Sequence, residues 1–145
     1  MSSEPRTINE LFNAAVERYR DDEFLKHKVD RSWQSLSFDE AARRVREFAL
    51  GLHSLGVQAG ERVAIWSENR PEWNLADLAV LGLGAADVPV YTSQARSQVR
   101  YILKDSAAKA MFVSASLMAE ALEIRREIPG LETVISLDAV SDADR

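Results

Sequence analysis

Short apolar runs alternate with helical segments through the second half of this sequence, and no other feature restricts the possible folds as strongly. The strand-like runs span four or five residues each: Arg62 to Trp66, Val88 to Tyr91, Lys109 to Val113 and Thr133 to Leu137. Helical segments separate them: Pro71 to about Gly84, a segment that ends near Asp105, and Leu117 to Ile128. This order is typical of βαβ crossovers on a parallel sheet. We therefore predict an α/β fold in which helices flank a parallel-type sheet over residues 57–137.

Residues 1–56 predict a helix, a hairpin and a second helix that lead into the sheet. Thr7 with Glu10, and Ser37 with Glu40, have the spacing of capping boxes, in which a side chain accepts a hydrogen bond from a free N–H at the helix start. Gly56 stands where a left-handed residue would end the second helix. Between the helices, loosely alternating residues and a turn predict two strands, Glu23 to Val29 and Trp33 to Ser37.

The composition excludes several classes of function. The formal net charge is −5, with basic and acidic residues intermixed, so nothing suggests electrostatic capture of nucleic acid. The chain has no cysteine, which removes disulfides, thiolate zinc sites and cysteine nucleophiles and fits a reducing compartment. The polar N-terminus lacks the apolar core of a secretory signal, and the longest apolar run, Leu75 to Ala86, is too short to span a bilayer. We therefore expect a cytoplasmic protein without a transmembrane segment.

Gly82 and Gly84 look like the opening of a dinucleotide-binding loop, but their context differs. Such a loop follows a strand and opens a helix, so that free N–H groups face the phosphates. Here the glycines end a predicted helix and precede a strand, and Asp87 occupies the place of the third glycine. A helix C-terminus carries negative partial charge, which repels phosphate. We therefore predict that the pair provides a helix exit and close packing on the sheet.

The reactive side chains form no catalytic or metal-binding constellation. His27 and His53 fall into no metal-ligand spacing with a carboxylate pair, and the acidic run at 21–23 is interpreted as a solvated loop. No Ser-His-Asp or Cys-His arrangement can be assembled. We therefore predict neither catalytic residues nor metal ligands in this chain. The tryptophans lie on separate predicted elements and are expected to pack in the core or between subdomains: Trp33, Trp66 and Trp73.

Polar segments follow two predicted strands at their carboxyl ends, where ligands bind in open α/β sheets. Ser67 to Arg70 follows the first strand and is either a ligand loop or, preferably, a helix-capping turn that leads into Pro71. Tyr91 to Gln94 follows the second strand and precedes a helix. Ser93 is placed to cap that helix, whose free N–H groups would then be available to an anion.

Four ordered blocks of this sequence resemble a known family. They are WQSLSFDEA (Trp33 to Ala41), LGVQAGERVAIWSENRPEW (Leu55 to Trp73), GLGAADVPVYTS (Gly82 to Ser93) and QVRYILKDS (Gln98 to Ser106). The same blocks occur in the same order in AMP-forming acyl-CoA synthetases of the adenylate-forming superfamily. The combination of NRPEW, VPVYTS and YILKDS is similar to the long-chain fatty-acid branch. The resemblance extends from about Thr7 to Leu137.

This resemblance implies a two-step ligase reaction in the full-length enzyme. A fatty-acid carboxylate attacks the α-phosphate of ATP to give acyl-AMP and pyrophosphate, and the thiol of coenzyme A then displaces AMP. The family uses ATP, Mg²⁺ and coenzyme A. In relatives the segment after the conserved proline approaches the coenzyme A side of the cleft, and this segment maps to Tyr91, Thr92 and Ser93. The resemblance makes these three residues the cofactor-binding candidates.

This chain has no counterpart of several motifs that members of the family carry. Their phosphate-binding loop ending in Pro-Lys-Gly, their adenine-binding motif, their ribose-binding aspartate and their C-terminal lysine lie downstream of the matched region. We therefore expect residues 1–145 to be a partial AMP-binding domain, the N-terminal subdomain, that is inactive alone. Its expected partner is the missing remainder of the enzyme or a second copy, and peripheral contact with a membrane stays open.

Two functional classes remain open at this point. The chain is either such a fragment of a fatty-acid–CoA ligase, or a free-standing α/β module that binds a nucleotide, acyl-CoA or another protein without catalysis. Binding of ATP, AMP or coenzyme A to the isolated chain would distinguish the module from the fragment.

Overall fold

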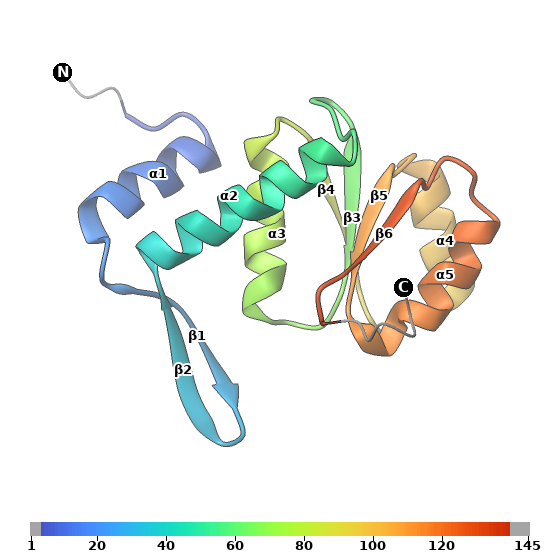
Figure 1. The fold of residues 1–145 in the computed structure, drawn as a ribbon. Coiled ribbons are helices and arrows are strands. Elements are labelled where there is room, and N and C mark those ends of the chain that lie inside the picture. The colour runs from blue at the N-terminus through green and yellow to red at the C-terminus, as the bar shows by residue number, and fades with distance from the viewer. Residues whose placement is uncertain (1–3, 140–145) are drawn as a thin grey trace.

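A four-stranded parallel sheet forms the centre of the computed structural model, which describes residues 4–139 (Figure 1). The strands are β3 (Arg62–Trp66), β4 (Ala86–Val90), β5 (Ala110–Val113) and β6 (Thr133–Ser136), in the spatial order β4-β3-β5-β6. The two central strands, β3 and β5, are almost fully buried, as expected for a parallel sheet covered on both faces. The predicted α/β fold with a parallel sheet and flanking helices is confirmed.

Four helices cover the two faces of the sheet, because successive residues of each strand point to opposite sides. On one face, Trp66 and Met111 pack in a core with two helices that follow β4 and β5 in the chain. On the other face, Ile65 and Phe112 pack with the two helices that flank β3 in the chain. The first pair is α4 (Arg96–Asp105) and α5 (Met118–Arg126), the latter preceded by a 3₁₀ turn (Ala115–Leu117); the second pair is α2 (Phe38–Ser54) and α3 (Pro71–Gly82). The result is a three-layer arrangement (Figure 1).

A helix and a hairpin precede these layers: α1 (Ile8–Tyr19), β1 (Glu23–Val29) and β2 (Ser32–Ser37). They share a third apolar cluster with α2 and α3, in which Phe12 and Leu36 pack against Leu75. Thr7 and Ser37 both cap their helices, accepting hydrogen bonds from the third helical residue at 3.1 and 3.2 Å. The reciprocal bond of the predicted capping box forms at Thr7, from whose N–H Glu10 accepts, but not at Ser37, since Glu40 pairs with Arg44 instead. The hairpin extends away from the body of the protein (Figure 1). No helix within residues 4–139 is long and apolar enough to cross a membrane.

Two predictions made from the sequence are corrected by the structure. The second strand of the sheet is β4, over Ala86–Val90 rather than 88–91, because Ala86 already pairs with Arg62. Tyr91 therefore lies beyond the strand and is 75% exposed. The packing predicted for Trp33, in the core or between subdomains, is not found: its side chain is 64% exposed, since it lies on the hairpin that extends from the body. Trp66 is fully buried and Trp73 half-buried, as predicted.

Candidate functional site

The carboxyl ends of all four parallel strands lie along one edge of the sheet, the lower edge in Figure 1. The segments that meet there follow β3 (Ser67–Arg70), β4 (Tyr91–Gln94), β5 (Ser114 and Ala115) and β6 (Leu137 and Asp138). In open α/β sheets the loops at this edge form the ligand-binding crevice. We therefore treat this carboxyl edge as the candidate site.

Arg70 is the centre of an ionic network at the carboxyl edge. It is the residue before α3, and its guanidinium contacts Glu72 at 2.8 Å, Asp138 at 2.8 Å and Glu68 at 3.7 Å. Asp138 also accepts a hydrogen bond from the backbone N–H of Ala115 at 2.7 Å. This N–H and the Arg70 guanidinium hold the pKa of Asp138 below its ordinary value. The network therefore connects the ends of β3, β5 and β6.

The segment after β4 is the most exposed part of the carboxyl edge. Tyr91, Thr92 and Ser93 are all exposed, and a turn is closed by the backbone N–H of Gln94 donating to the Tyr91 carbonyl at 3.2 Å. Three hydroxyl groups in succession are therefore available to a ligand with hydrogen-bonding groups.

Ser93 does not cap α4, contrary to the prediction from the sequence. The helix begins at Arg96, and Ala95 is its N-cap residue. The Gln98 side chain accepts a hydrogen bond from the Ala95 N–H at 3.0 Å, so a side chain from within the helix satisfies that donor. Ser93 is the serine nearest to the helix, but it lies two residues before the observed N-cap position.

Four buried side-chain atoms within residues 4–139 have no hydrogen-bond partner there: His27 Nδ1, Trp66 Nε1, Gln94 Oε1 and Ser114 Oγ. Three of these residues end or follow the parallel strands at the carboxyl edge, and His27 lies on the hairpin beside it. Trp66 and Ser114 are each 1% exposed, so bulk water does not reach them. Buried polar groups in native proteins are nearly always hydrogen-bonded, and an unpaired one costs about 1–3 kcal/mol. The carboxyl edge is thus the incompletely satisfied part of the described fold.

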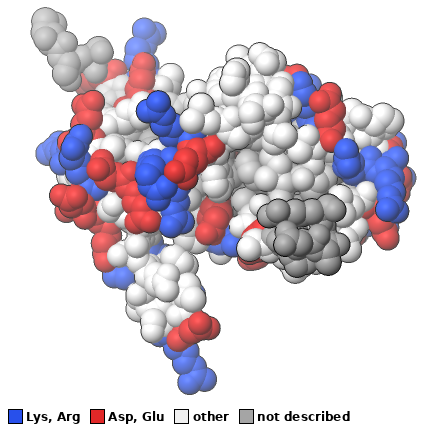
Figure 2. Space-filling view, viewed as in Figure 1, with Lys and Arg blue, Asp and Glu red and all other residues white. Residues whose placement is uncertain are grey.

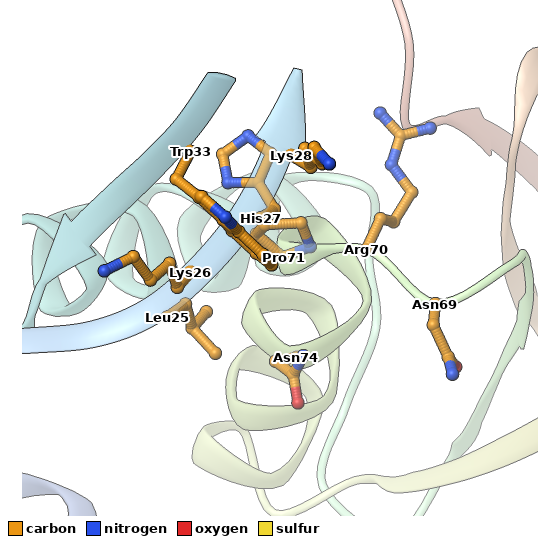
Figure 3. Close-up of a pocket in the computed structure, with 9 residues that line it drawn as sticks. All are labelled: Leu25, Lys26, His27, Lys28, Trp33, Asn69, Arg70, Pro71 and Asn74. Carbon is orange, nitrogen blue, oxygen red and sulfur yellow. The ribbon is translucent and has the colours of Figure 1, made fainter. Parts of the chain in front are cut away.

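A cavity of about 440 Å³ separates the hairpin from the N-terminus of α3 (Figure 3). Figure 3 shows Trp33 and His27 of the hairpin beside Pro71, while the guanidinium of Arg70 extends away from them. The Lys28 ammonium lies 5.9 Å from the centre of the Trp33 ring, and Lys26 pairs with Glu23 at 3.2 Å. The cavity therefore has an aromatic wall with basic groups at its rim, and it opens beside the carboxyl edge.

The glycine pair lies away from this site. Gly82 is the last residue of α3, and Gly84 adopts a φ of +72° in the turn that leads into the amino end of β4. A side chain at Gly84 would come within 3.3 Å of the Ala59 side chain. The predicted helix exit is confirmed, whereas the close packing is at Gly84 alone and is made against the loop before β3 rather than on the sheet.

Acidic and basic side chains are intermixed on the helices, and no one-sign patch dominates the face seen in Figure 2. Within residues 4–139, no three histidine or carboxylate side chains gather as a metal site would require. From the sequence we identified Ser67–Arg70 and Tyr91–Ser93, but not Ser114 or Asp138. The rule that polar residues follow strands at their carboxyl ends would have identified both.

Comparison with known proteins supplies the family context. A sequence model of the family described as "AMP-binding enzyme" matches residues 12–145. The chain is 39% identical over 140 residues to the long-chain-fatty-acid–CoA ligase FadD15 of Mycobacterium bovis, covering 92% of this chain and 23% of that protein. It is 33% identical over 144 residues to the long-chain-fatty-acid–CoA ligase heimdall of Drosophila melanogaster, covering 96% of this chain and 21% of the relative.

Solved structures share the fold at lower sequence identity. The adenylation domain of a carboxylate reductase from Mycobacterium chelonae superposes with a TM-score of 0.85 at 20% identity, covering 99% of this chain and 25% of that one. The N-terminal domain of FACL13 from Mycobacterium tuberculosis superposes with a TM-score of 0.81 at 22% identity, covering 92% of this chain and 34% of that one. The chain thus spans less than a quarter of the curated relatives reported above and about a third or less of these structures.

Proposed function

This chain belongs to the AMP-binding enzyme family, and we propose that it is the N-terminal subdomain of a ligase that activates a long-chain fatty acid with ATP and transfers the acyl group to coenzyme A. One observation carries the proposal. Two relatives named as long-chain-fatty-acid–CoA ligases match 92% and 96% of this chain, which is 23% and 21% of their own length.

In this proposal the carboxyl edge is one wall of the enzyme's cleft. The exposed segment Tyr91–Ser93 supports it, because ligands bind at the carboxyl ends of the strands in open α/β sheets. The ionic network of Arg70 and Asp138 would keep the strand ends of this wall in place. The two divisions of the chain, residues 1–56 and 57–137, would act as one scaffold.

The exposed residues after β4 are suited to contact part of a coenzyme A molecule. Tyr91, Thr92 and Ser93 offer neutral donors and acceptors suited to the amide and phosphate oxygens of that molecule, and we propose that they lie on its side of the cleft. Coenzyme A supplies the thiol that accepts the acyl group. The role that we propose for these three residues is to bind and orient.

The described residues do not fit a triphosphate with Mg²⁺. The N-cap residue of α3, Arg70, is paired with three carboxylates, and within residues 4–139 no acidic cluster of metal-ligand size is present. We derive no step of adenylation from this chain, and we expect it to be inactive alone.

Calorimetry and pyrophosphate exchange on the isolated chain test the proposal. We expect no exchange with ATP and fatty acid, no micromolar binding of ATP or AMP, and at most millimolar binding of coenzyme A. Micromolar binding of any of the three without exchange would favour a free-standing binding module. Clear exchange would contradict the assignment of the chain as a scaffold without adenylation chemistry.

A further inference from the structure

The outer edge of β2 carries free backbone groups. Within residues 4–139, β2 pairs with β1 alone, and the two form a separate two-stranded sheet. β1 packs against α3, whereas β2 lies on the far side of the hairpin from α3 (Figure 1). The N–H and C=O groups along the outer edge of β2 therefore face away from the body, where another strand has access to them.

The composition of β2 leaves this edge open to pairing. Folded proteins protect exposed strand edges with charged residues, proline or a bulge. β1 has such protection, with Glu23, Lys26 and Lys28 along it and a register irregularity between Glu23 and Leu25. β2 has the sequence SWQSLS, without a charge or a proline. Figure 2 agrees, since charged atoms on the visible face of the hairpin gather near its tip and its base.

We propose that β2 pairs antiparallel with β2 of a second copy of this chain. The two-fold axis then passes midway between the two Gln34 residues, which lie opposite each other. In this register Ser32 lies opposite the partner's Leu36, and Trp33 lies opposite the partner's Ser35. The two Trp33 side chains are then diagonal neighbours on one face of the new sheet, at a spacing of about 7–8 Å that aromatic side chains can bridge.

Four properties of the hairpin favour a second copy as the occupant. The uncharged edge is self-complementary, so pairing with itself brings no like charges together. Pairing covers part of Trp33, whose side chain is 64% exposed in one chain. A two-stranded ribbon is marginally stable by itself, and the pairing converts two such ribbons into a four-stranded sheet. Extension of the hairpin from the body leaves its outer edge accessible (Figure 1).

Light scattering coupled to size-exclusion chromatography tests the proposal on the intact 145-residue chain over a range of concentrations. We expect a concentration-dependent dimer with twice the 16.2 kDa mass of one chain. Gln34→Lys places two ammonium groups together at the axis, and we expect it to weaken dimerisation by at least about tenfold in Kd. Trp33→Ser removes the aromatic pair and should also weaken the dimer.

Asn13→Lys is the matched control. It makes the same change in charge at an exposed position of α1, outside β1 and β2, and should leave the Kd unchanged. Circular dichroism checks that each variant keeps its fold. A chain that stays monomeric at every accessible concentration overturns the proposal, as does a dimer that resists both hairpin substitutions or one that Asn13→Lys weakens equally. The readout is independent of ligase activity.

Discussion

The two edges of the parallel sheet differ in how completely they are satisfied. At the amino edge, Lys109 donates to the Gly56 carbonyl at 2.8 Å and pairs with Glu61 at 3.1 Å, and Arg62 donates to the Ser106 carbonyl at 2.6 Å. The turns at this edge also hydrogen-bond to one another: the backbone N–H of Gly60 donates to the Gly84 carbonyl. At the carboxyl edge, Trp66, Gln94 and Ser114 keep buried polar atoms without partners in the described chain.

This difference separates the scaffold of the protein from its working surface. A network that is satisfied internally resists change, because removing one member leaves the other buried and unpaired. An unpaired buried group, by contrast, already costs stability in the folded chain, so replacing it with an apolar group removes that cost. We therefore expect substitutions at the amino edge to reduce stability, and substitutions of unpaired groups at the carboxyl edge to leave it unchanged or raise it.

The largest expected effect lies at the amino edge, in the turn between α3 and β4. Gly84→Ala puts a side chain at a φ of +72° and within 3.3 Å of Ala59, and should lower the free energy of unfolding by about 2 kcal/mol. Gly82→Ala is the control, because open space surrounds that position at the end of a helix; it should be neutral or stabilise by about 0.5 kcal/mol. Urea unfolding measures both. If both substitutions lowered the free energy of unfolding equally, the turn at Gly84 would not be as sterically restricted as the structure indicates.

Lys109→Met should produce the next largest loss at the amino edge. The substitution leaves the Gly56 carbonyl without its donor and should cost about 1–2 kcal/mol in the free energy of unfolding. Lys104→Met, on the exposed side of α4, should stay within about 0.5 kcal/mol of the native protein. Thermal unfolding measures both variants. If Lys109→Met and Lys104→Met lower the stability equally, the hydrogen bonds of Lys109 do not stabilise the amino edge.

Asp77 is the expected exception to the rule that substitutions on the amino side reduce stability. The effect of replacing it on the free energy of unfolding depends on pH. Burial, together with the charge of Asp87 and a hydrogen bond to it, raises the pKa of Asp77 from 3.8 to about 6. The folded state therefore holds a proton that the unfolded state loses earlier, so this contribution to stability is complete below pH 3.8 and is lost as pH rises through 6. Asp77→Asn should stabilise the protein by about 1 kcal/mol at pH 7.5, after allowance for solvent screening.

Unfolding of Asp77→Asn and the native protein at pH 4 and pH 7.5 measures this prediction. The advantage of the variant should shrink at the lower pH, where the native Asp77 is protonated as well. An advantage that is the same at both values would show that it does not arise from the carboxylate pair.

The smallest expected effect is a gain at the carboxyl edge. Ser114→Ala removes a buried hydroxyl without a partner and should raise the free energy of unfolding by about 0.5 kcal/mol. Ser67→Ala is the matched control, because the Ser67 hydroxyl donates to the Glu68 carbonyl at 3.0 Å; it should cost about 1 kcal/mol. A loss of stability in Ser114→Ala as large as in Ser67→Ala would mean that the Ser114 hydroxyl is satisfied.

Most of the fold follows from local patterns in the sequence. Strand and helix periods predicted the order of the elements, and the spacing of Thr7 and Glu10 predicted the first helix cap. The start of α4 could not be placed in this way, because Gln98 satisfies the Ala95 N–H from within the helix. The exposure of Trp33 was also missed, since an aromatic residue in a strand gives no sign of how far that strand extends from the body.

The candidate site was predicted in part. Ser67–Arg70 and Tyr91–Ser93 were assigned to the carboxyl edge, because parallel strands bring their ends together whatever the loops contain. The pairing of Arg70 with Asp138 could not be predicted, since these residues are far apart in the chain and meet because β3 and β6 lie on either side of β5.

The sequence by itself determined which segments are strands, which are helices and which glycines end a helix, because hydrophobic period and capping act over a few neighbouring residues. Tertiary structure alone decided which polar groups are satisfied and which remain unpaired. That outcome depends on the strand order, which sets the distance between residues far apart in the chain and therefore which donors and acceptors can meet.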